Sequence, residues 1–478
     1  MKTNCSIYTS LIAFFLLSVL IATPSISFAQ DITGQWNSLL KVPGASLRLL
    51  IHITESEDGS FSSKMDSPDQ NSYGIPTTST TFKDGTLNFE IASMALEYSG
   101  EFNTDTETIE GTFKQGGQSF PLNFNRKEIK KEKPNRPQEP LEPFSYYTEE
   151  VKFPNEQADI TLAGTLSLPK IDGDFPVVIL ISGSGAQDRN EEILGHKPFL
   201  VLADHLTRMG IGVLRYDDRG FGESTGDFAA ATTEDFAADV ESAIAYLKSR
   251  TDINPNNIGL IGHSEGGIIA PMVATKDNSN VAFMVLLAAP AVSGAEILLL
   301  QQQVISQVSG VPQDVIANQQ RMNKGLFDII VDSPNMSNKV LFNNLVSYLK
   351  ENLTEDEYPS GVSKEIFLAN QINPLINPWF RFFLGYDPLI ALKNLDTPVF
   401  ALNGSKDLQV DANQNLSLIE KSLNKAGNKQ LKAKLYADLN HLFQESKSGL
   451  VTEYGTIEQT ISPLVLADIS EWINSLDQ

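Results

Sequence analysis

Cysteine and histidine are scarce in this chain of 478 residues. Its single cysteine, Cys5, lies in a segment that we expect to be removed from the mature protein. Disulfides, thiol chemistry and cysteine-ligated metals are then excluded. The five histidines are His52, His196, His205, His263 and His441. A reaction that needs a histidine base therefore has few candidates.

Basic residues and long apolar runs are also few. The chain has 36 Lys and Arg against 59 Asp and Glu, a formal net charge of −23. Its most basic stretch, residues 126–133, contains interleaved glutamates and is typical of a solvated spacer. After the N-terminal region no apolar run approaches the length of a membrane span. We therefore expect neither a nucleic-acid partner nor stable membrane insertion.

The N-terminus has the pattern of a cleavable secretory signal. A basic start at Lys2 precedes a short apolar core over Leu11–Ala22, and small residues stand at Ser27 and Ala29. The core is too short to cross a bilayer comfortably. The sequence predicts a signal peptide over residues 1–29 and an exported protein, periplasmic or secreted.

Three further regions follow. Residues 30–127 show short alternating stretches with hairpin signals at Asp84-Gly85 and Gly116-Gly117, which predicts a small antiparallel all-β domain. This domain could bind a cell-surface polymer, but we favour a scaffold that packs on or shields its neighbour. Residues 128–145 are rich in proline and charge and predict an extended linker. Residues 146–478 predict an α/β domain.

A nucleophilic serine is indicated by the run from Asn257 to Gly267. A short apolar strand ends in Gly-x-Ser-x-Gly, with Ser264 at its centre, and a helix-forming stretch follows. This is the nucleophile-elbow pattern, in which the serine sits on a strained strand-to-helix turn. A side chain at Gly262 or Gly266 would collide with the neighbouring strand or helix. The backbone N–H of Glu265 would then lie where it can stabilise an oxyanion.

Candidates for the base and the acid that this serine needs lie further along the chain. His441 lies in a polar turn near the C-terminus, and Asp407 lies in a loop after the apolar strand that begins at Pro398. A nucleophile needs a base, and the base needs an orienting acid. The order Ser264, Asp407, His441 is the chain order of the α/β-hydrolase triad. His196, in a loop, is a weaker competitor for the base.

The second oxyanion donor is expected in the loop after an earlier strand. The apolar run from Phe175 to Ile181 opens into Ser182-Gly183-Ser184-Gly185. Two glycines allow the backbone to turn its amides toward the elbow, so we choose the N–H of Ser184, with Gly185 next. Asp188 and Arg189 either shape the substrate entrance or pin the loop through an ion pair, and we favour the second interpretation.

Residues from about Glu149 to Gln478 resemble an α/β-hydrolase of the exported bacterial carboxylesterase type, close to the serine-aminopeptidase-like branch. The segments that carry the resemblance are 183–189, 215–224, 262–266, 403–407 and 440–441. It implies ester hydrolysis through an acyl-enzyme intermediate, with no cofactor and no metal. The charges of Arg215–Ser224 then form a structural network. The fold class we expect is an α/β-hydrolase fold with a helical lid insertion, preceded by the small antiparallel all-β domain.

The lid is predicted at about residues 293–388, because two successive core strands are separated by far more chain than one helix needs. Its helical periodicity covers Ala295–Val308, Pro312–Asp332, Ser337–Leu353 and Ser363–Gln371. The stretch from Trp379 to Tyr386 is the most aromatic in the chain. Trp379 and Phe382 are candidates to line an acyl pocket, although these aromatics could equally form the lid's own core.

The sequence therefore predicts a serine carboxylesterase acting on a small-molecule ester, possibly one attached to a polymer. Two alternatives stay open. A serine peptidase or aminopeptidase of the same fold would use the same triad, and a non-catalytic binding protein on a hydrolase scaffold would not use it. The sequence does not define the acyl chain, the alcohol portion or the oligomeric state.

Overall fold

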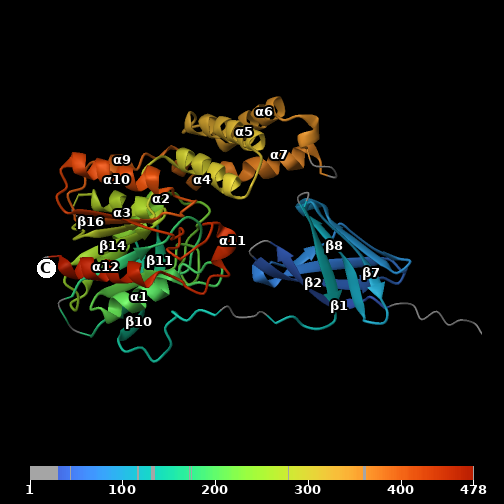
Figure 1. Cartoon of the computed structure of the whole chain (residues 1–478), viewed down its shortest axis with the longest axis horizontal. Coiled ribbons are helices and arrows are strands. Elements are labelled where there is room, and N and C mark those ends of the chain that lie inside the picture. Colours follow the sequence, from blue (N-terminus) through green and yellow to red (C-terminus); the bar gives the residue numbers. More distant parts are fainter. Residues whose placement is uncertain are drawn as a thin grey trace, which may run out of the picture.

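The computed structural model describes residues 31–476 except 43–44, 71, 116–117, 131–134, 172, 174, 278 and 359–361. The proposed signal peptide and the Gly116-Gly117 turn lie outside the described residues. An N-terminal β domain and a larger α/β domain lie side by side (Figure 1). Within the described chain, no helix combines the length and the apolar character needed to cross a membrane.

The β domain is one antiparallel sheet curled into a half-barrel. Its strand order is β4-β3-β2-β1-β9-β8-β7-β6-β5, so the first strand pairs with the second and the ninth. Alternate residues such as Leu49, Ile51 and Ile53 face a buried core. At the predicted hairpin, Asp84 and Gly85 both have positive φ, 51° and 80°, as a type I′ turn requires. The strands are β1 (Gly34–Val42), β2 (Ala45–Glu55), β3 (Phe61–Ser67), β4 (Ser72–Pro76), β5 (Ser79–Lys83), β6 (Thr86–Ile91), β7 (Leu96–Asn103), β8 (Thr108–Gln115) and β9 (Gln118–Asn125).

The α/β domain contains an eight-stranded sheet of order β10-β11-β13-β12-β14-β15-β16-β17. The first two strands are antiparallel, and β12 to β17 run parallel. The parallel strands from β12 to β16 are buried at every residue and mostly apolar, because both faces of the sheet are covered. The strands are β10 (Tyr147–Asn155), β11 (Ile160–Leu168), β12 (Val177–Ile181), β13 (Gly212–Tyr216), β14 (Ile258–His263), β15 (Met284–Leu287), β16 (Val399–Gly404) and β17 (Leu431–Tyr436).

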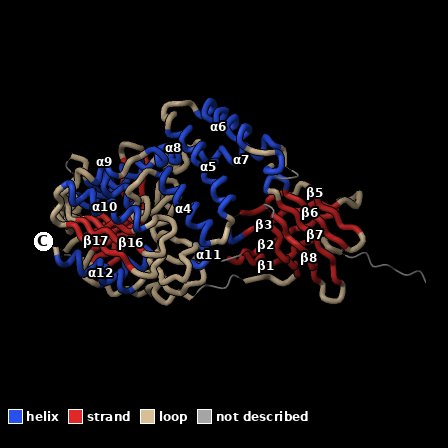
Figure 2. The backbone as a smooth tube through the Cα atoms, turned by 45° about the horizontal axis from the view of Figure 1, so that its top comes forward, coloured by secondary structure: helices blue, strands red, loops and turns tan. Residues whose placement is uncertain are grey.

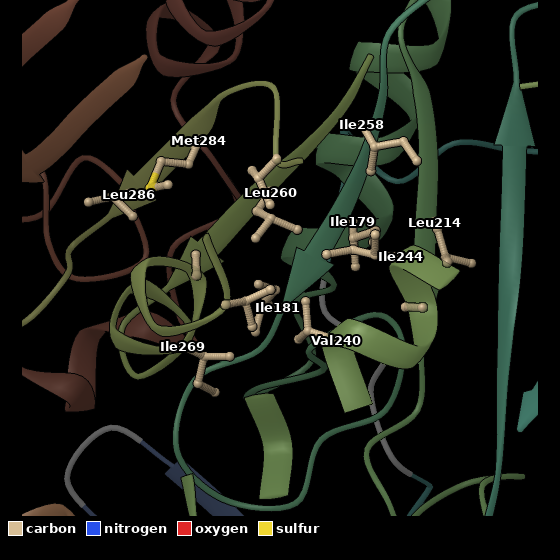
Figure 3. Close-up of a cluster of buried hydrophobic side chains, with 14 of the residues drawn as sticks. Ile179, Ile181, Leu214, Val240, Ile244, Ile258, Leu260, Ile269, Met284 and Leu286 are labelled. Atoms are coloured by element: carbon tan, nitrogen blue, oxygen red, sulfur yellow. The ribbon is translucent and has the colours of Figure 1, made fainter. Parts of the chain in front are cut away.

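Helices cover both faces of this sheet. On one face, Val240 and Ile244 of α2 (Thr233–Ser249) and Ile269 of α3 (Gly266–Ala274) pack on strand residues (Figure 3). Helix α10 (Ala412–Ala426) extends the same layer. On the other face, α1 (Pro198–Arg208) and α12 (Pro463–Ser475) pack together against the sheet. A short helix, α11 (Val451–Tyr454), precedes α12. This strand order with helices on both faces is the predicted α/β-hydrolase fold, which is confirmed.

The segment between β15 and β16 forms the helical lid (Figure 2). It has a small core of its own, which includes Leu326, Leu345 and Leu384. The four helices expected from periodicity are present within about two residues of the predicted bounds, and the aromatic stretch forms one more. The helices are α4 (Gly294–Val308), α5 (Gln313–Val331), α6 (Asn338–Asn352), α7 (Lys364–Ile372), α8 (Pro378–Gly385) and α9 (Leu389–Leu392).

The second half of the predicted linker is docked on the α/β domain. The Arg136 guanidinium donates to the backbone carbonyls of Gly195 at 3.0 Å and of Gly455 and Ile457 at 2.9 Å. The Gln138 side chain accepts the N–H of Thr460 at 2.6 Å and donates to the backbone carbonyl of Ile461 at 2.7 Å. We call residues 135–145 the strap. Its contacts join the segment before the α/β domain to the C-terminal part of that domain.

Candidate active site

Ser264 occupies a strained turn between β14 and α3. Its φ is +53°, in the left-handed region that non-glycine residues rarely adopt. A Cβ on Gly262 would lie 2.0 Å from the carbonyl oxygen of Gly266, and a Cβ on Gly266 would lie 2.2 Å from that of Ile181. Both glycines are therefore required for the turn. This is the geometry that the Gly-x-Ser-x-Gly pattern predicts.

Asp407 and His441 form a buried pair at the carboxyl ends of β16 and β17. Nδ1 of His441 lies 2.8 Å from Oδ2 of Asp407, and both side chains are at most 5% exposed. The other oxygen of Asp407 accepts the N–H groups of Gln409 and Val410 at 2.8 and 2.9 Å. With Nδ1 bound to the carboxylate, Nε2 is the ring nitrogen left for a proton transfer.

Ser264 and His441 line the same cavity, which has a volume of about 260 Å³. Among the described residues no hydrogen bond joins the Ser264 hydroxyl to the His441 ring. Such bonds are often long in ligand-free enzymes and tighten when substrate binds. The structure thus brings the predicted acid and base into contact and places the predicted nucleophile at the same cavity. Asp411, a nearby acid, instead caps α10 by accepting the N–H of Gln414 at 2.9 Å.

The two predicted oxyanion donors, Ser184 and Glu265, also line this cavity. Within the described part of the chain, neither of their backbone N–H groups has a hydrogen-bond acceptor. The N–H of Gly183, in contrast, is used by Glu191 Oε1 at 2.9 Å. Gly185, the second choice, is not among the lining residues. Two N–H groups of this kind beside a serine hydroxyl can receive a developing negative charge.

The loop that carries Ser184 is held by two acids of the turn after β13. Asp218 accepts the Ser182 hydroxyl at 2.8 Å and the N–H of Gln187 at 2.9 Å. Burial raises the pKa of Asp218 to about 8. Arg189 is paired with Asp217 at 2.7 Å. Arg189 therefore pins the loop, as we favoured from the sequence, and its ion-pair partner belongs to the predicted structural network.

The lid contributes apolar side chains to the cavity. Trp379 lines it as predicted, but Phe382 does not. Phe382 stacks on Tyr386, with ring centroids 5.4 Å apart, whereas Phe383 lines the cavity and stacks on Trp379 at 5.1 Å. Residues four apart share one face of α8, so the spacing from Trp379 favours Phe383. The apolar lining residues are Ile193, Pro290, Ile297, Leu298, Trp379, Phe383, Val410 and Leu442.

Glu265 has a second role that the sequence did not suggest. Its buried carboxylate accepts the Trp379 Nε1–H at 2.8 Å and the Thr233 hydroxyl at 2.7 Å, and it also interacts with the Ser184 side chain. Burial raises the pKa of Glu265, and these hydrogen bonds act in the opposite direction. One carboxylate beside Ser264 therefore contacts the lid, α2 and the loop that carries Ser184. We call this loop, residues 182–189, the oxyanion loop after its predicted donor.

The other histidines occupy different environments. His196 is buried between Thr460 and the carbonyl of Tyr454, and burial lowers its pKa to about 4. It does not line the cavity, and neither do His52 and His205. His263, in contrast, lies at the cavity, although the pattern treated it as a variable position. No group of three or more metal-ligating side chains is found among the described residues.

Comparison with known proteins finds similarity to hydrolases. Residues 197–348 match the family model described as serine aminopeptidase, S33. Esterase EstD of Thermotoga maritima is 27% identical over 324 residues, which cover 66% of this chain and 67% of that protein. The chain has the α/β-hydrolase fold. Putative hydrolase YtaP of Bacillus subtilis is 32% identical over 125 residues, 23% of this chain and 42% of YtaP.

The similarity of this chain to solved structures is weaker than its similarity to EstD. The Pyrococcus furiosus esterase PF2001 aligns with a TM-score of 0.41 at 15% identity, over 72% of this chain and 98% of that one. The hypothetical protein PA2218 of Pseudomonas aeruginosa aligns with a TM-score of 0.42 at 16% identity, over 73% and 99%. These scores are too low to bear on activity. The match of residues 197–348 to the serine aminopeptidase family model instead supports the serine-aminopeptidase-like branch.

Proposed function

We propose that this hydrolase is a serine carboxylesterase with the triad Ser264, His441 and Asp407. The observation that carries the proposal is the 2.8 Å contact between Nδ1 of His441 and Oδ2 of Asp407. His441 lines the same cavity as Ser264. The similarity to an esterase over two thirds of the chain supports the same activity. The proposed chemistry needs no metal or cofactor.

In the acylation step, Ser264 Oγ attacks the ester carbonyl while His441 Nε2 takes its proton. Asp407 holds the imidazole in the required tautomer and stabilises its charged form. The carbonyl oxygen becomes negatively charged, and the free N–H groups of Ser184 and Glu265 donate to it. His441 then protonates the leaving alcohol, and the acyl group remains on the serine.

In the deacylation step, His441 removes a proton from water, which attacks the acyl-enzyme carbonyl. The same two N–H groups stabilise the second oxyanion. The bond to Ser264 Oγ breaks, His441 returns the proton to the serine, and the carboxylic acid leaves. Helix α8 and α4 of the lid cover the cavity with apolar side chains, which limits access of bulk water and fits a compact ester.

An aminopeptidase of the same fold is the second candidate, since the family match carries that description. Such an enzyme must bind the free amino group of its substrate, which a carboxylate would do. The carboxylates among the described cavity-lining residues are Glu191 and Glu265. Glu265 already binds Trp379 and Thr233, and Glu191 already binds His263. Engagement of both carboxylates favours an ester over an aminoacyl amide.

We further propose that the protein is exported and that the β domain is an accessory to the catalytic domain. Export rests on the signal-peptide pattern of residues 1–29 alone. The proposed substrate is a small ester, either free or attached to a polymer. We propose neither a nucleic-acid partner nor stable membrane insertion.

Export is tested by fractionation of a bacterial host that expresses the full chain, followed by N-terminal sequencing. Retention in the cytoplasm with residues 1–29 intact would contradict it.

A panel of chromogenic esters and aminoacyl amides, run on the chain from Asp31, tests the activity. We expect hydrolysis of esters, little cleavage of the amides, and loss of activity by on the order of 10⁴-fold in Ser264→Ala. Preference for the amides would favour the peptidase. Equal activity in folded Ser264→Ala would reject a serine mechanism and leave the binding-protein alternative or a different nucleophile.

A further inference from the structure

Glu191 lies where three loops of the active site meet. It follows β12, is 4% exposed, and has a φ of +52°. Its Oε1 accepts the N–H of Gly183 at 2.9 Å and lies 2.8 Å from Nδ1 of His263. One carboxylate oxygen therefore joins the oxyanion loop to the elbow. A non-glycine residue held in the left-handed region indicates that the surrounding contacts fix this position.

His263 continues this connection to the catalytic histidine. Its Nε2 lies 3.1 Å from the backbone carbonyl oxygen of His441, and the two imidazole rings are 4.8 Å apart between centroids. The partners of His263 are a carboxylate and a carbonyl, and both can only accept. Each ring nitrogen must then carry a proton, so both contacts are hydrogen bonds only if His263 is an imidazolium.

The surrounding charges agree with this protonation state. The charges that act on His263 are those of Glu191 and Asp407, and its ring also lies against the ring of His441. Burial acts to lower the pKa of His263, but the Glu191 carboxylate and the His441 carbonyl more than offset it, and the pKa is raised. The second carboxylate oxygen of Glu191 is buried and has no hydrogen-bond partner among the described residues. Glu191 thus depends mainly on His263 to balance its charge.

We propose that Glu191 and His263 form a buried ion pair that positions both the oxyanion loop and the catalytic histidine. Neither residue takes part in bond making, and each acts through a neighbour. Gly183, held by Glu191, precedes the oxyanion donor Ser184, and a Cβ on Gly183 would lie only 3.2 Å from that of Ser264. His263 holds the backbone of His441. This role rests on the proposed function, whereas the protonation state of His263 does not.

The protonation state can be measured on the unmodified chain by NMR with ¹⁵N-labelled histidine. The five histidines give a tractable spectrum, and His263→Asn assigns the signal of His263. We expect both ring nitrogens of His263 to be protonated at pH 8, where an ordinary histidine with a pKa near 6.5 is about 97% neutral. A neutral His263 at pH 7 would overturn the ion pair, whatever the activity of the enzyme.

The positioning role is tested by Glu191→Gln, which keeps the shape of the side chain but removes its charge. We expect kcat to fall by on the order of 100-fold with a small change in KM, because a displacement of about 1 Å at the reacting groups costs that much. The imidazolium signal of His263 should also disappear at pH 8. Glu192→Gln, at the exposed neighbouring position, is the matched control and should change neither property.

His263→Gln provides a second, independent variant, because its amide carries no charge and donates from one nitrogen only, so it does not replace both N–H groups of an imidazolium. We expect the same loss of kcat, and we expect the double variant with Glu191→Gln to be little worse than either single one. Normal kcat in a folded single variant would overturn the positioning role. Full ester hydrolysis by Ser264→Ala would instead reject the proposed triad while leaving the NMR result unaffected.

Discussion

The indole Nε1–H of Trp379 donates to the carboxylate of Glu265 at 2.8 Å, which links the lid to the residue directly after Ser264. The two residues are 114 positions apart in the chain. The Trp379 ring also stacks on Phe383 and lines the cavity. Trp379 therefore has two separable properties: a ring that occupies space in the cavity, and an N–H that joins the lid to Glu265.

Substitutions at Trp379 separate these properties. Trp379→Ala should enlarge the cavity, raise KM for acetate and shift preference toward butyrate or octanoate esters by about 10-fold or more in relative kcat/KM. Trp379→Phe keeps a ring but removes the N–H, so it should preserve the chain-length preference and lower the melting temperature, because Glu265 loses a donor.

Phe382→Ala is the control for the lid, because Phe382 stacks on Tyr386 outside the cavity. It should lower stability and affect all esters alike. The measurement is kcat/KM for acetate, butyrate and octanoate esters together with the melting temperature. The same profile of losses for Trp379→Ala and Phe382→Ala would show that Trp379 does not select the acyl chain.

The identity of the catalytic acid is tested by a pair of substitutions. Asp407→Asn should lower kcat by on the order of 10⁴-fold, because the amide favours the wrong tautomer of His441. Asp411→Asn should leave kcat near normal, because asparagine caps a helix about as well as aspartate. Steady-state kinetics on an acetate ester compares them. A severe loss in Asp411→Asn with near-normal turnover in Asp407→Asn would reverse the assignment.

The sequence was most informative where local geometry determines the structure. The elbow requires glycine at positions 262 and 266, because a Cβ there meets backbone atoms at 2.0 to 2.2 Å. A requirement of this kind leaves a pattern in neighbouring residues. The lid helices were likewise predicted within about two residues, because their apolar faces repeat with helical period.

The sequence was least informative where contacts join distant segments. Glu191 and His263 are 72 positions apart, and neither lies in a pattern that predicts an ion pair. Of the two predicted pocket residues, Trp379 lines the cavity and Phe382 does not, because aromatic composition alone does not show which face of α8 meets the cavity. Helical spacing from Trp379 could have indicated Phe383. The docking of the strap has no local signal either, since Arg136 donates to carbonyls on remote loops.

The raised pKa of Asp218 predicts how stability depends on pH. A carboxyl group with a folded-state pKa of about 8 binds its proton more tightly in the native state than in the unfolded state. Its contribution to stability is full below the unfolded value of about 4 and is lost as pH rises toward 8. Asp218→Asn cannot ionise, so its free energy of unfolding should increase relative to the parent protein between pH 4 and pH 8.

Urea denaturation at several pH values measures this difference. Asp227→Asn is the control, because Asp227 is exposed in the same turn region and should leave the pH dependence unchanged. If Asp218→Asn and the parent protein lose stability in parallel over this range, Asp218 is ionised in the folded protein near neutral pH. The oxyanion loop would then be held by a charged carboxylate.

The strap predicts that the position of an N-terminal truncation determines stability. A chain that begins at Asn135 keeps the hydrogen bonds of Arg136 and Gln138 to the α/β domain, whereas one that begins at Pro143 loses them. Hydrogen bonds from a charged group contribute about 1.5–3 kcal/mol, so the shorter chain should melt several degrees lower. If the β domain is an accessory, both chains should hydrolyse a small ester with similar kcat/KM at low temperature.

Point variants of the whole protein exclude an effect of truncation itself. Arg136→Ala should reproduce much of the loss in melting temperature, because it leaves the carbonyls of Gly195, Gly455 and Ile457 without this donor. Lys130→Ala removes an exposed positive charge from the preceding segment and should have no effect. The strap does not stabilise the α/β domain if the two truncated chains melt at the same temperature and Arg136→Ala melts at the temperature of the parent protein. Loss of small-ester hydrolysis in a folded chain from Asn135 would instead give the β domain a part in the active site.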